Sequence, residues 1–273
     1  MADGRNFLDP QVLARLLPQP LLTRLPMQGT VSGQHKSPHR GSSVEFAEYR
    51  NYAPGDDIRR LDWRVFGRTD RFYMKEFEAE TNLRCYLVLD CSGSMSFAGK
   101  HGSKLDYAKR LAATLAYLVV QHGDAAGLIC VGEKKICEIP PRRNPSHLQT
   151  IFDTLEKAGP EGETGLVNAL HDVAETIRSR ALVLIFSDFF CDPDSLLSCL
   201  QHLRFQKHDL AVFHLLDRME VEFKFDRPVR FEDLESSFSL VTEPASVREE
   251  YLKQLHQFLE LMRAGCHEFK TDY

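Results

Sequence analysis

The sequence contains no apolar run that approaches the roughly 20 residues needed to cross a bilayer. Its start does not form a secretory signal, because Arg15, Pro18 and Pro20 interrupt the short apolar stretch there. The seven cysteines are odd in number and include no C-x-x-C pair, a pattern typical of buried thiols in a reducing compartment rather than of disulfides. We therefore expect a cytoplasmic protein.

Motifs for nucleotide binding and for nucleophilic catalysis are also lacking. Neither a P-loop nor a Gly-x-Gly-x-x-Gly motif occurs, and the segment CSGSM at 91–95 is not the Gly-x-Ser-x-Gly elbow of serine hydrolases. The net charge of −5, from 34 basic and 39 acidic residues, does not indicate a nucleic-acid-binding protein. These absences favour a binding module without its own nucleotide.

From residue 84 onward, apolar strand-like segments alternate with amphipathic helix-like segments. This order predicts an α/β fold, a doubly wound and mostly parallel sheet with helices on both faces. The predicted strands are 84–89, 126–131, 181–187 and 210–216, with antiparallel edge strands at 135–139 and 266–270. The predicted helices are 104–121, 146–157, 165–179, 193–206 and 246–265, with an extended hairpin insertion at about 220–243.

The first 83 residues differ in character from this alternating part. A short helix is predicted at 9–17, with Asp9 as its N-cap, and the stretch after it is rich in proline, glycine and serine. The segment 49–63 mixes arginines and aspartates with aromatic residues, which favours a structural cluster of ion pairs and, second, a docking surface. We therefore divide the chain into an N-terminal segment, 1–83, and an α/β domain, 84–273.

Oxygen-bearing side chains gather where the predicted strands end. Asp90 closes the first strand and is followed by Ser92 and Ser94, Asp188 closes the third long strand, and Thr164 stands in a glycine-rich loop before a helix. In open α/β sheets, sites form beyond the carboxyl ends of the strands. Two carboxylates and three hydroxyls are ligands for a hard cation, so we expect Mg²⁺, with Mn²⁺ or Ca²⁺ as alternatives.

Two other interpretations of these residues remain open. The Asp-x-Ser-x-Ser spacing is weak by itself, since Asp90 could simply cap the following turn in a metal-free scaffold. A magnesium-dependent hydrolase with Asp90 as nucleophile is a third possibility. That chemistry needs a second acid two residues later, and Ser92 occupies this position.

With Asp90, Ser92, Ser94, Thr164 and Asp188 in this order, the sequence resembles the metal-ion-dependent adhesion site of von Willebrand factor A-type domains. The segment 37–77, with its Arg-x-Tyr-x-Pro-Gly-Asp-Asp motif at 50–57, resembles the bacterial family catalogued as domain of unknown function fifty-eight. The resemblance implies direct metal ligation by the three hydroxyls, with the two aspartates acting through water. Phe189 departs from the pattern, because many A-type domains have glycine there.

Members of that family are often encoded beside MoxR-type AAA ATPases. The resemblance therefore implies a non-enzymatic adaptor that binds such an ATPase, or its client protein, through an Asp or Glu that completes the metal site. We expect neither nucleic acid nor a membrane span in this interaction. The small and apolar residues expected to form the rim of the site are Gly93, Met95, Phe97, Phe189 and Phe190.

Overall fold

The computed structural model describes residues 7–18, 35–36, 45–52, 62–78, 80–81, 83–100, 102–225, 229–235 and 239–273. Contacts within the chain divide it into two units, one of residues 1–21 and 84–273 and one of residues 22–83. Helix α1 (Pro10–Leu16) belongs to the first unit, and the Asp9 carboxylate caps it by accepting hydrogen bonds from the backbone of Gln11 and Val12.

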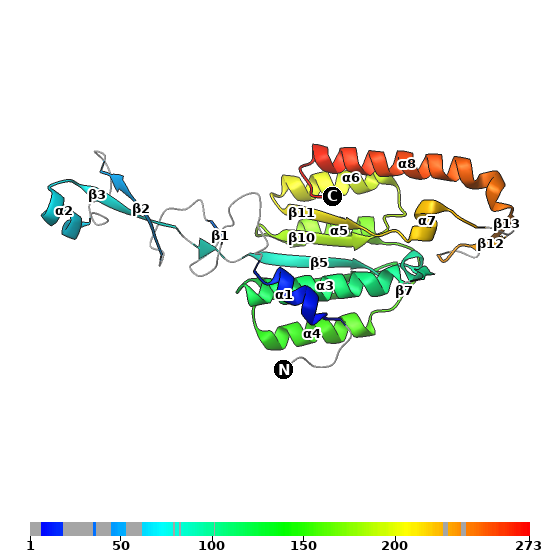
Figure 1. The fold of residues 1–273 in the computed structure, drawn as a ribbon, viewed down its shortest axis with the longest axis horizontal. Coiled ribbons are helices and arrows are strands. Elements are labelled where there is room, and N and C mark those ends of the chain that lie inside the picture. The colour runs from blue at the N-terminus through cyan, green and yellow to red at the C-terminus, as the bar shows by residue number, and fades with distance from the viewer. Residues whose placement is uncertain are drawn as a thin grey trace. The chain divides into compact units, whose positions relative to one another are not determined.

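A five-stranded sheet forms the centre of the first unit (Figure 1). Its order is β11-β10-β5-β8-β9; all neighbours are parallel except the edge strand β9, which is antiparallel to β8. The chain enters at the middle strand, continues to one edge and returns to the other side, so the order reverses beside β5. The strands are β5 (Arg84–Asp90), β8 (Ala125–Val131), β9 (Lys135–Arg142), β10 (Leu182–Ser187) and β11 (Asp209–His214).

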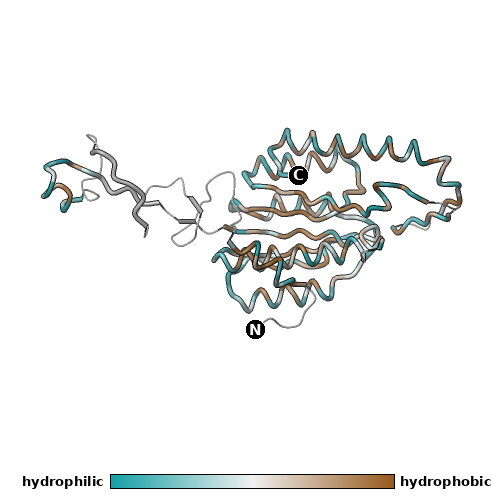
Figure 2. The backbone as a smooth tube through the Cα atoms, viewed as in Figure 1, coloured by the Kyte–Doolittle hydropathy of each residue, from teal (hydrophilic) through white to brown (hydrophobic). Residues whose placement is uncertain are grey.

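Helices cover both faces of this sheet, which confirms the predicted fold class. Figure 1 shows α3 and α4 on one side and α6 and α8 on the other, and Figure 2 shows that β5 and β10 between them are strongly apolar. Buried residues of α5, α6 and α8 form one core with alternate residues of the strands. The helices are α3 (Lys104–Gln121), α4 (Pro145–Lys157), α5 (Leu166–Thr176), α6 (Pro193–Phe205) and α8 (Pro244–Glu268).

The last helix is longer than predicted, and the edge strand predicted at 266–270 is wrong. Helix α8 continues through Gly265 to Glu268, because this glycine serves packing rather than helix termination. A Cβ atom at Gly265 would lie only 2.3 Å from Cδ2 of Leu197 in α6, so the glycine allows the two helices to approach closely. Only Asp272 then reaches the sheet, in an isolated bridge with Ala211.

The predicted insertion contains a helix as well as a hairpin. After β11 the chain forms α7 (Arg218–Glu222), whose first turn is held by a capping box between Asp217 and Glu220. The antiparallel hairpin follows, with strands β12 (Val229–Glu232) and β13 (Ser239–Thr242). In Figure 1 these elements lie beyond the carboxyl end of β5, which is where the sequence predicts a functional site.

The second unit is built on short elements. Strands β2 (Glu45–Asn51) and β3 (Tyr73–Glu78) pair antiparallel, as do β1 (His35–Lys36) and β4 (Glu80–Thr81). Asp62 caps α2 (Trp63–Thr69). The rings of Phe66 and Phe72 stack with centroids 4.5 Å apart. Residues 53–61, which carry much of the predicted ion-pair cluster, lie outside the described residues.

Candidate metal centre

Three loops at the carboxyl end of the sheet carry the five predicted ligands. Hydrogen bonds tie the first loop, after β5, to the second, before α5. The backbone N–H of Gly93 donates to the carbonyl of Gly162 at 2.9 Å, and that of Glu161 donates to the carbonyl of Cys91 at 2.7 Å. The loops that carry Ser92, Ser94 and Thr164 are therefore held together by the fold itself.

Asp90 is a buried carboxylate with only 1% of its surface exposed. Its Oδ1 accepts a hydrogen bond from the backbone N–H of Ser92 at 2.9 Å, and its Oδ2 accepts one from the Ser187 hydroxyl at 2.5 Å. Burial is the largest cause of a pKa raised to about 6, because removal from water disfavours the charged form. A nearby cation would offset this cost.

The two serine hydroxyls lie side by side in this first loop. Ser92 Oγ and Ser94 Oγ are 3.1 Å apart, with Ser92 buried and Ser94 partly exposed at the start of a 3-10 turn, η2 (Gly93–Ser96). Two neighbouring oxygens around Mg²⁺, each about 2.0–2.1 Å from the ion, are themselves about 3 Å apart. The separation therefore fits two adjacent ligands of one such ion.

An acid from the hairpin insertion connects Ser94 to Thr164. The backbone N–H of Ser94 donates to Glu235 Oε1 at 3.3 Å, and that of Thr164 donates to Glu235 Oε2 at 3.2 Å. Both residues therefore lie within the span of one carboxylate group. Thr164 Oγ1 accepts a longer hydrogen bond, 3.4 Å, from the backbone N–H of Leu166 at the start of α5.

Asp188 forms an ion pair with a buried lysine, Lys104. Its Oδ2 accepts a hydrogen bond from Lys104 Nζ at 2.8 Å, and the same ammonium lies 2.7 Å from Glu220 Oε1. The side chains of Lys104 and Asp188 are 4% and 2% exposed. Lys104 opens α3, where the helix dipole disfavours a positive charge, so these two carboxylates hold it in place. Asp188 is thus partly neutralised before any metal arrives.

The aromatic rim is smaller than the sequence predicted. Phe189 is 1% exposed, and Met95 and Gly93 are buried, so these three rim assignments are wrong. Phe189 has φ of 55°, in the left-handed region where glycine is most easily accommodated, and its ring packs edge-on against His214. Phe190 is 43% exposed and Phe97 partly exposed, and both rings lie near the Lys104 ammonium.

Sequence reasoning missed three charged residues around the centre: Lys104, Glu220 and Glu235. The acidic stretch at 232–235 of the insertion was the signal available for Glu235, while Lys104 offered none, because a lysine at a helix start is commonly solvated. Within the described ranges, no group of three or more His, Cys, Asp or Glu side chains is arranged to hold a metal. Metal binding here would therefore depend on the hydroxyls.

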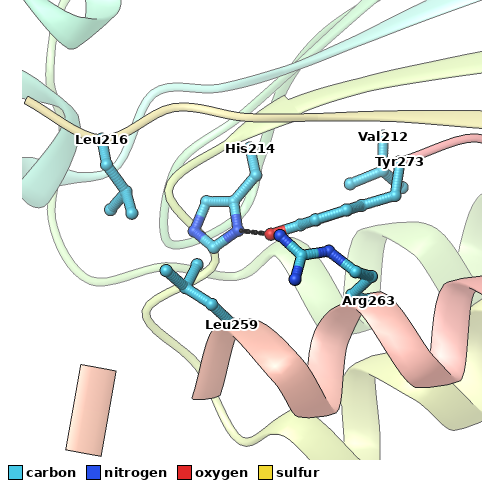
Figure 3. A pocket seen from close by; sticks show the side chains of 6 residues that line it. All are labelled: Val212, His214, Leu216, Leu259, Arg263 and Tyr273. Carbon is cyan, nitrogen blue, oxygen red and sulfur yellow. Dashed lines mark hydrogen bonds between the residues drawn. The ribbon is translucent and has the colours of Figure 1, made fainter. Parts of the chain in front are cut away.

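A separate cavity of about 280 Å³ lies between β11 and α8 (Figure 3). Figure 3 shows His214 Nδ1 and the Tyr273 hydroxyl joined by a hydrogen bond of 2.7 Å. Burial is the main cause of a pKa of about 4 for His214, so this ring is neutral near pH 7. The cavity is lined by Val212, His214, Leu216, Leu259, Arg263 and Tyr273.

No helix among the described residues combines the length and the apolar character that crossing a membrane requires.

Comparison with known proteins finds similar chains and similar folds. Protein Rv1480 of Mycobacterium tuberculosis is 29% identical over 231 residues, which are 84% of this chain and 72% of that protein. The solved structure of the conserved hypothetical protein BatB from Bacteroides thetaiotaomicron covers 67% of this chain and all of its own, at 14% identity and a TM-score of 0.45. A von Willebrand factor type A protein from Catenulispora acidiphila covers 68% of this chain and 44% of its own, at 10% identity and a TM-score of 0.38.

The α/β domain has the doubly wound, mostly parallel sheet that the sequence predicted: its strand order reverses beside β5, and its three polar loops lie at the carboxyl ends of the strands. The profile of the family described as "Protein of unknown function DUF58" matches residues 48–258. This match extends over more than half of the 273 residues. The chain therefore belongs to the family described as protein of unknown function DUF58.

Proposed function

We propose that the protein is a metal-dependent protein-interaction module. Mg²⁺ is the expected ion, held by the hydroxyls of Ser92, Ser94 and Thr164, with Asp90 and Asp188 in support. The observation that carries the proposal is the 3.1 Å separation of Ser92 Oγ and Ser94 Oγ directly beside the buried carboxylate of Asp90. A hard cation bound mainly by neutral hydroxyls remains incompletely neutralised and attracts a further carboxylate from outside.

Binding suits this geometry better than catalysis does. The Ser92 hydroxyl is engaged within its own loop, since it lies 3.1 Å from the Ser94 hydroxyl and also forms a hydrogen bond with the Asp90 carboxylate. Asp90 accepts hydrogen bonds through both carboxylate oxygens, so it is held by its own loops rather than presented to a substrate. The von Willebrand factor A-like fold, common among interaction domains, supports the same conclusion.

The partner in this proposal is a MoxR-type AAA ATPase, or a client protein that it matures or remodels. The support is membership of a family whose genes often stand beside those of such ATPases. The partner would present an Asp or Glu to the metal, and Phe97 and Phe190 would lie at the contact. The cytoplasmic location expected from the cysteines stays a prediction.

A metal-free scaffold is the second candidate, and one observation favours it. The ammonium of Lys104 lies 2.8 Å from Asp188, so part of the negative charge is neutralised without a metal. In that case, the hydroxyls would serve only the hydrogen bonding of the loops.

Thermal unfolding in Mg²⁺ and in EDTA separates the two candidates. A ligand that binds only the native state, at 100 times its dissociation constant, stabilises that state by about 2.7 kcal/mol. We expect this gain for the wild type and its loss in Ser92→Ala, whereas the exposed helix variant Ser198→Ala should retain it. Identical melting of the wild type in millimolar Mg²⁺ and in EDTA would favour the metal-free scaffold.

A further inference from the structure

The hairpin insertion places its own carboxylate at the candidate metal centre. Glu235 lies in the chain that leaves β12, 141 positions after Ser94 and 71 after Thr164, yet it accepts hydrogen bonds from the backbone of both. Its side chain is partly buried in this position. The aspartate two residues earlier shapes the turn, since Asp233 Oδ1 accepts a hydrogen bond from the backbone N–H of Glu235 at 3.0 Å.

The segment between β11 and β13 contacts the first loop at two separate points. A Cβ atom at Gly93 would lie 2.3 Å from the carbonyl oxygen of Leu234 and 3.3 Å from Cγ of Glu235, so only glycine leaves room for the hairpin. A Cβ atom at Gly99 would lie 2.2 Å from the Asp217 carboxylate, which caps α7. The approach of Glu235 is therefore part of a shaped contact.

The chemistry of Glu235 is that of a metal ligand. Each carboxylate oxygen accepts one backbone N–H, and each has a second lone pair for a further interaction. Glu235 also contributes negative charge to the candidate metal centre. Lys104, which is shared between Asp188 and Glu220, neutralises part of the charge of Asp188, and Glu235 adds a further negative charge beside that of Asp90.

On the basis of the proposed function, we propose that Glu235 is the chain's own carboxylate ligand of the metal. It takes the coordination position that a partner's Asp or Glu would otherwise fill. A partner with an acidic side chain then binds by displacing the hairpin residues Leu234 and Glu235 from the first loop. Partner binding and hairpin docking are therefore mutually exclusive at this centre.

Titration of the full-length protein with Mn²⁺, a spectroscopic substitute for Mg²⁺, tests this assignment. We expect Glu235→Gln to raise the Mn²⁺ dissociation constant about tenfold, because it removes a charged ligand while it preserves side-chain shape. Water-proton relaxation per bound Mn²⁺ should rise as a water replaces the carboxylate. Added acetate, a free carboxylate probe, should lower that relaxation in Glu235→Gln and not in the wild type. The control is Glu232→Gln, an exposed acid of the same hairpin.

A second variant displaces the hairpin without a change to any ligand. Gly93→Ala should force the Leu234 carbonyl away and reproduce the affinity loss of Glu235→Gln, while Gly159→Ala, with open space around its Cβ, should not. If the wild type binds Mn²⁺ and Ser92→Ala does not, but Glu235→Gln and Gly93→Ala match the wild type, this inference is wrong and the proposed function stands. If the wild type binds no Mn²⁺ at millimolar concentration, both are wrong.

Discussion

Asp90 illustrates how one residue connects folding to metal binding. Its carboxylate is buried, and the effect of burial exceeds that of its hydrogen bonds with Ser92 and Ser187, so its pKa is raised to about 6, whereas an aspartate in an unfolded chain has a pKa of about 3.9. The fold therefore binds the proton more tightly than the unfolded chain does. The contribution of Asp90 to stability is fully present below about pH 4 and is lost as the pH rises through about 6.

Replacement of Asp90 by asparagine tests how much the burial of the ionised carboxylate lowers the stability of the fold. Each pKa unit corresponds to about 1.4 kcal/mol, so in EDTA at pH 7 we expect Asp90→Asn to exceed the wild type in unfolding free energy by up to about 3 kcal/mol. The difference should disappear below about pH 4, and in Mg²⁺ only the wild type should gain. Urea denaturation at several pH values measures both effects, with the exposed residue variant Asp172→Asn as control. A less stable Asp90→Asn in EDTA at pH 7 would contradict the argument.

At Phe189, the family pattern indicates the backbone conformation but not whether the side chain is exposed. The resemblance draws attention to glycine at this position, and the positive φ of 55° supplies the physical reason. The strain of a phenylalanine in this conformation is offset by burial of its ring against His214. The residue therefore supports the third loop from within, and Phe190 alone of this pair is exposed.

At the scale of elements, one buried ion cluster joins α3, the loop after β10 and α7. Lys104 lies within 2.8 Å of both Asp188 and Glu220, and its side chain is 4% exposed. Removal of one partner of a buried pair leaves an uncompensated charge, which costs about 3–5 kcal/mol. The cluster also positions α7, the element from which the hairpin insertion continues.

We expect Lys104→Met to lower the unfolding free energy in EDTA by about 3 kcal/mol, since it leaves the buried carboxylate of Asp188 and the partly buried one of Glu220 without their cation. The same variant should gain more from Mg²⁺ than the wild type does, because the full charge of Asp188 becomes available to the metal. The exposed residue variant Lys100→Met is the matched control. Chemical denaturation in EDTA and in Mg²⁺ measures both values. Unchanged stability in EDTA would show that the ion cluster does not stabilise the contact between α3, the loop after β10 and α7.

At the scale of the whole molecule, the proposed interface combines a metal with an exposed aromatic residue. Buried aromatic residues contribute most of the binding energy at many interfaces. We expect an immobilised full-length protein to capture a purified MoxR-type ATPase in Mg²⁺ and not in EDTA, with capture lost in Ser92→Ala. Phe190→Ala should weaken capture at least about tenfold.

The exposed residue variant Phe205→Ala, on α6, is the control for that measurement, since Phe205 is 82% exposed. Capture that is indifferent both to metal and to Ser92 would move the interface away from this centre. The arginine- and aspartate-rich segment at 50–71 would then be the next surface to test.

Local patterns predicted the five strands of the sheet and the polar loops at its carboxyl end, but they also predicted an edge strand at 266–270 that is not formed. The apolar runs at 84–89 and 181–187 identified β5 and β10, because strands covered on both faces have few polar residues. Helical periodicity placed α3 at its observed bounds. The oxygen-bearing residues after each strand followed from chain order alone, since parallel strands bring their carboxyl ends to one edge.

Only the tertiary structure decided how charge is arranged around the centre. Lys104 and Asp188 are 84 positions apart, and Ser94 and Glu235 are 141 apart, so no local pattern relates them. The burial of Phe189 likewise depends on His214, which another strand supplies. The sequence by itself determined which oxygens are available at this edge of the sheet, because backbone periodicity is local. Which of them are already neutralised or already occupied depends on contacts between distant segments, which form only when the chain has folded.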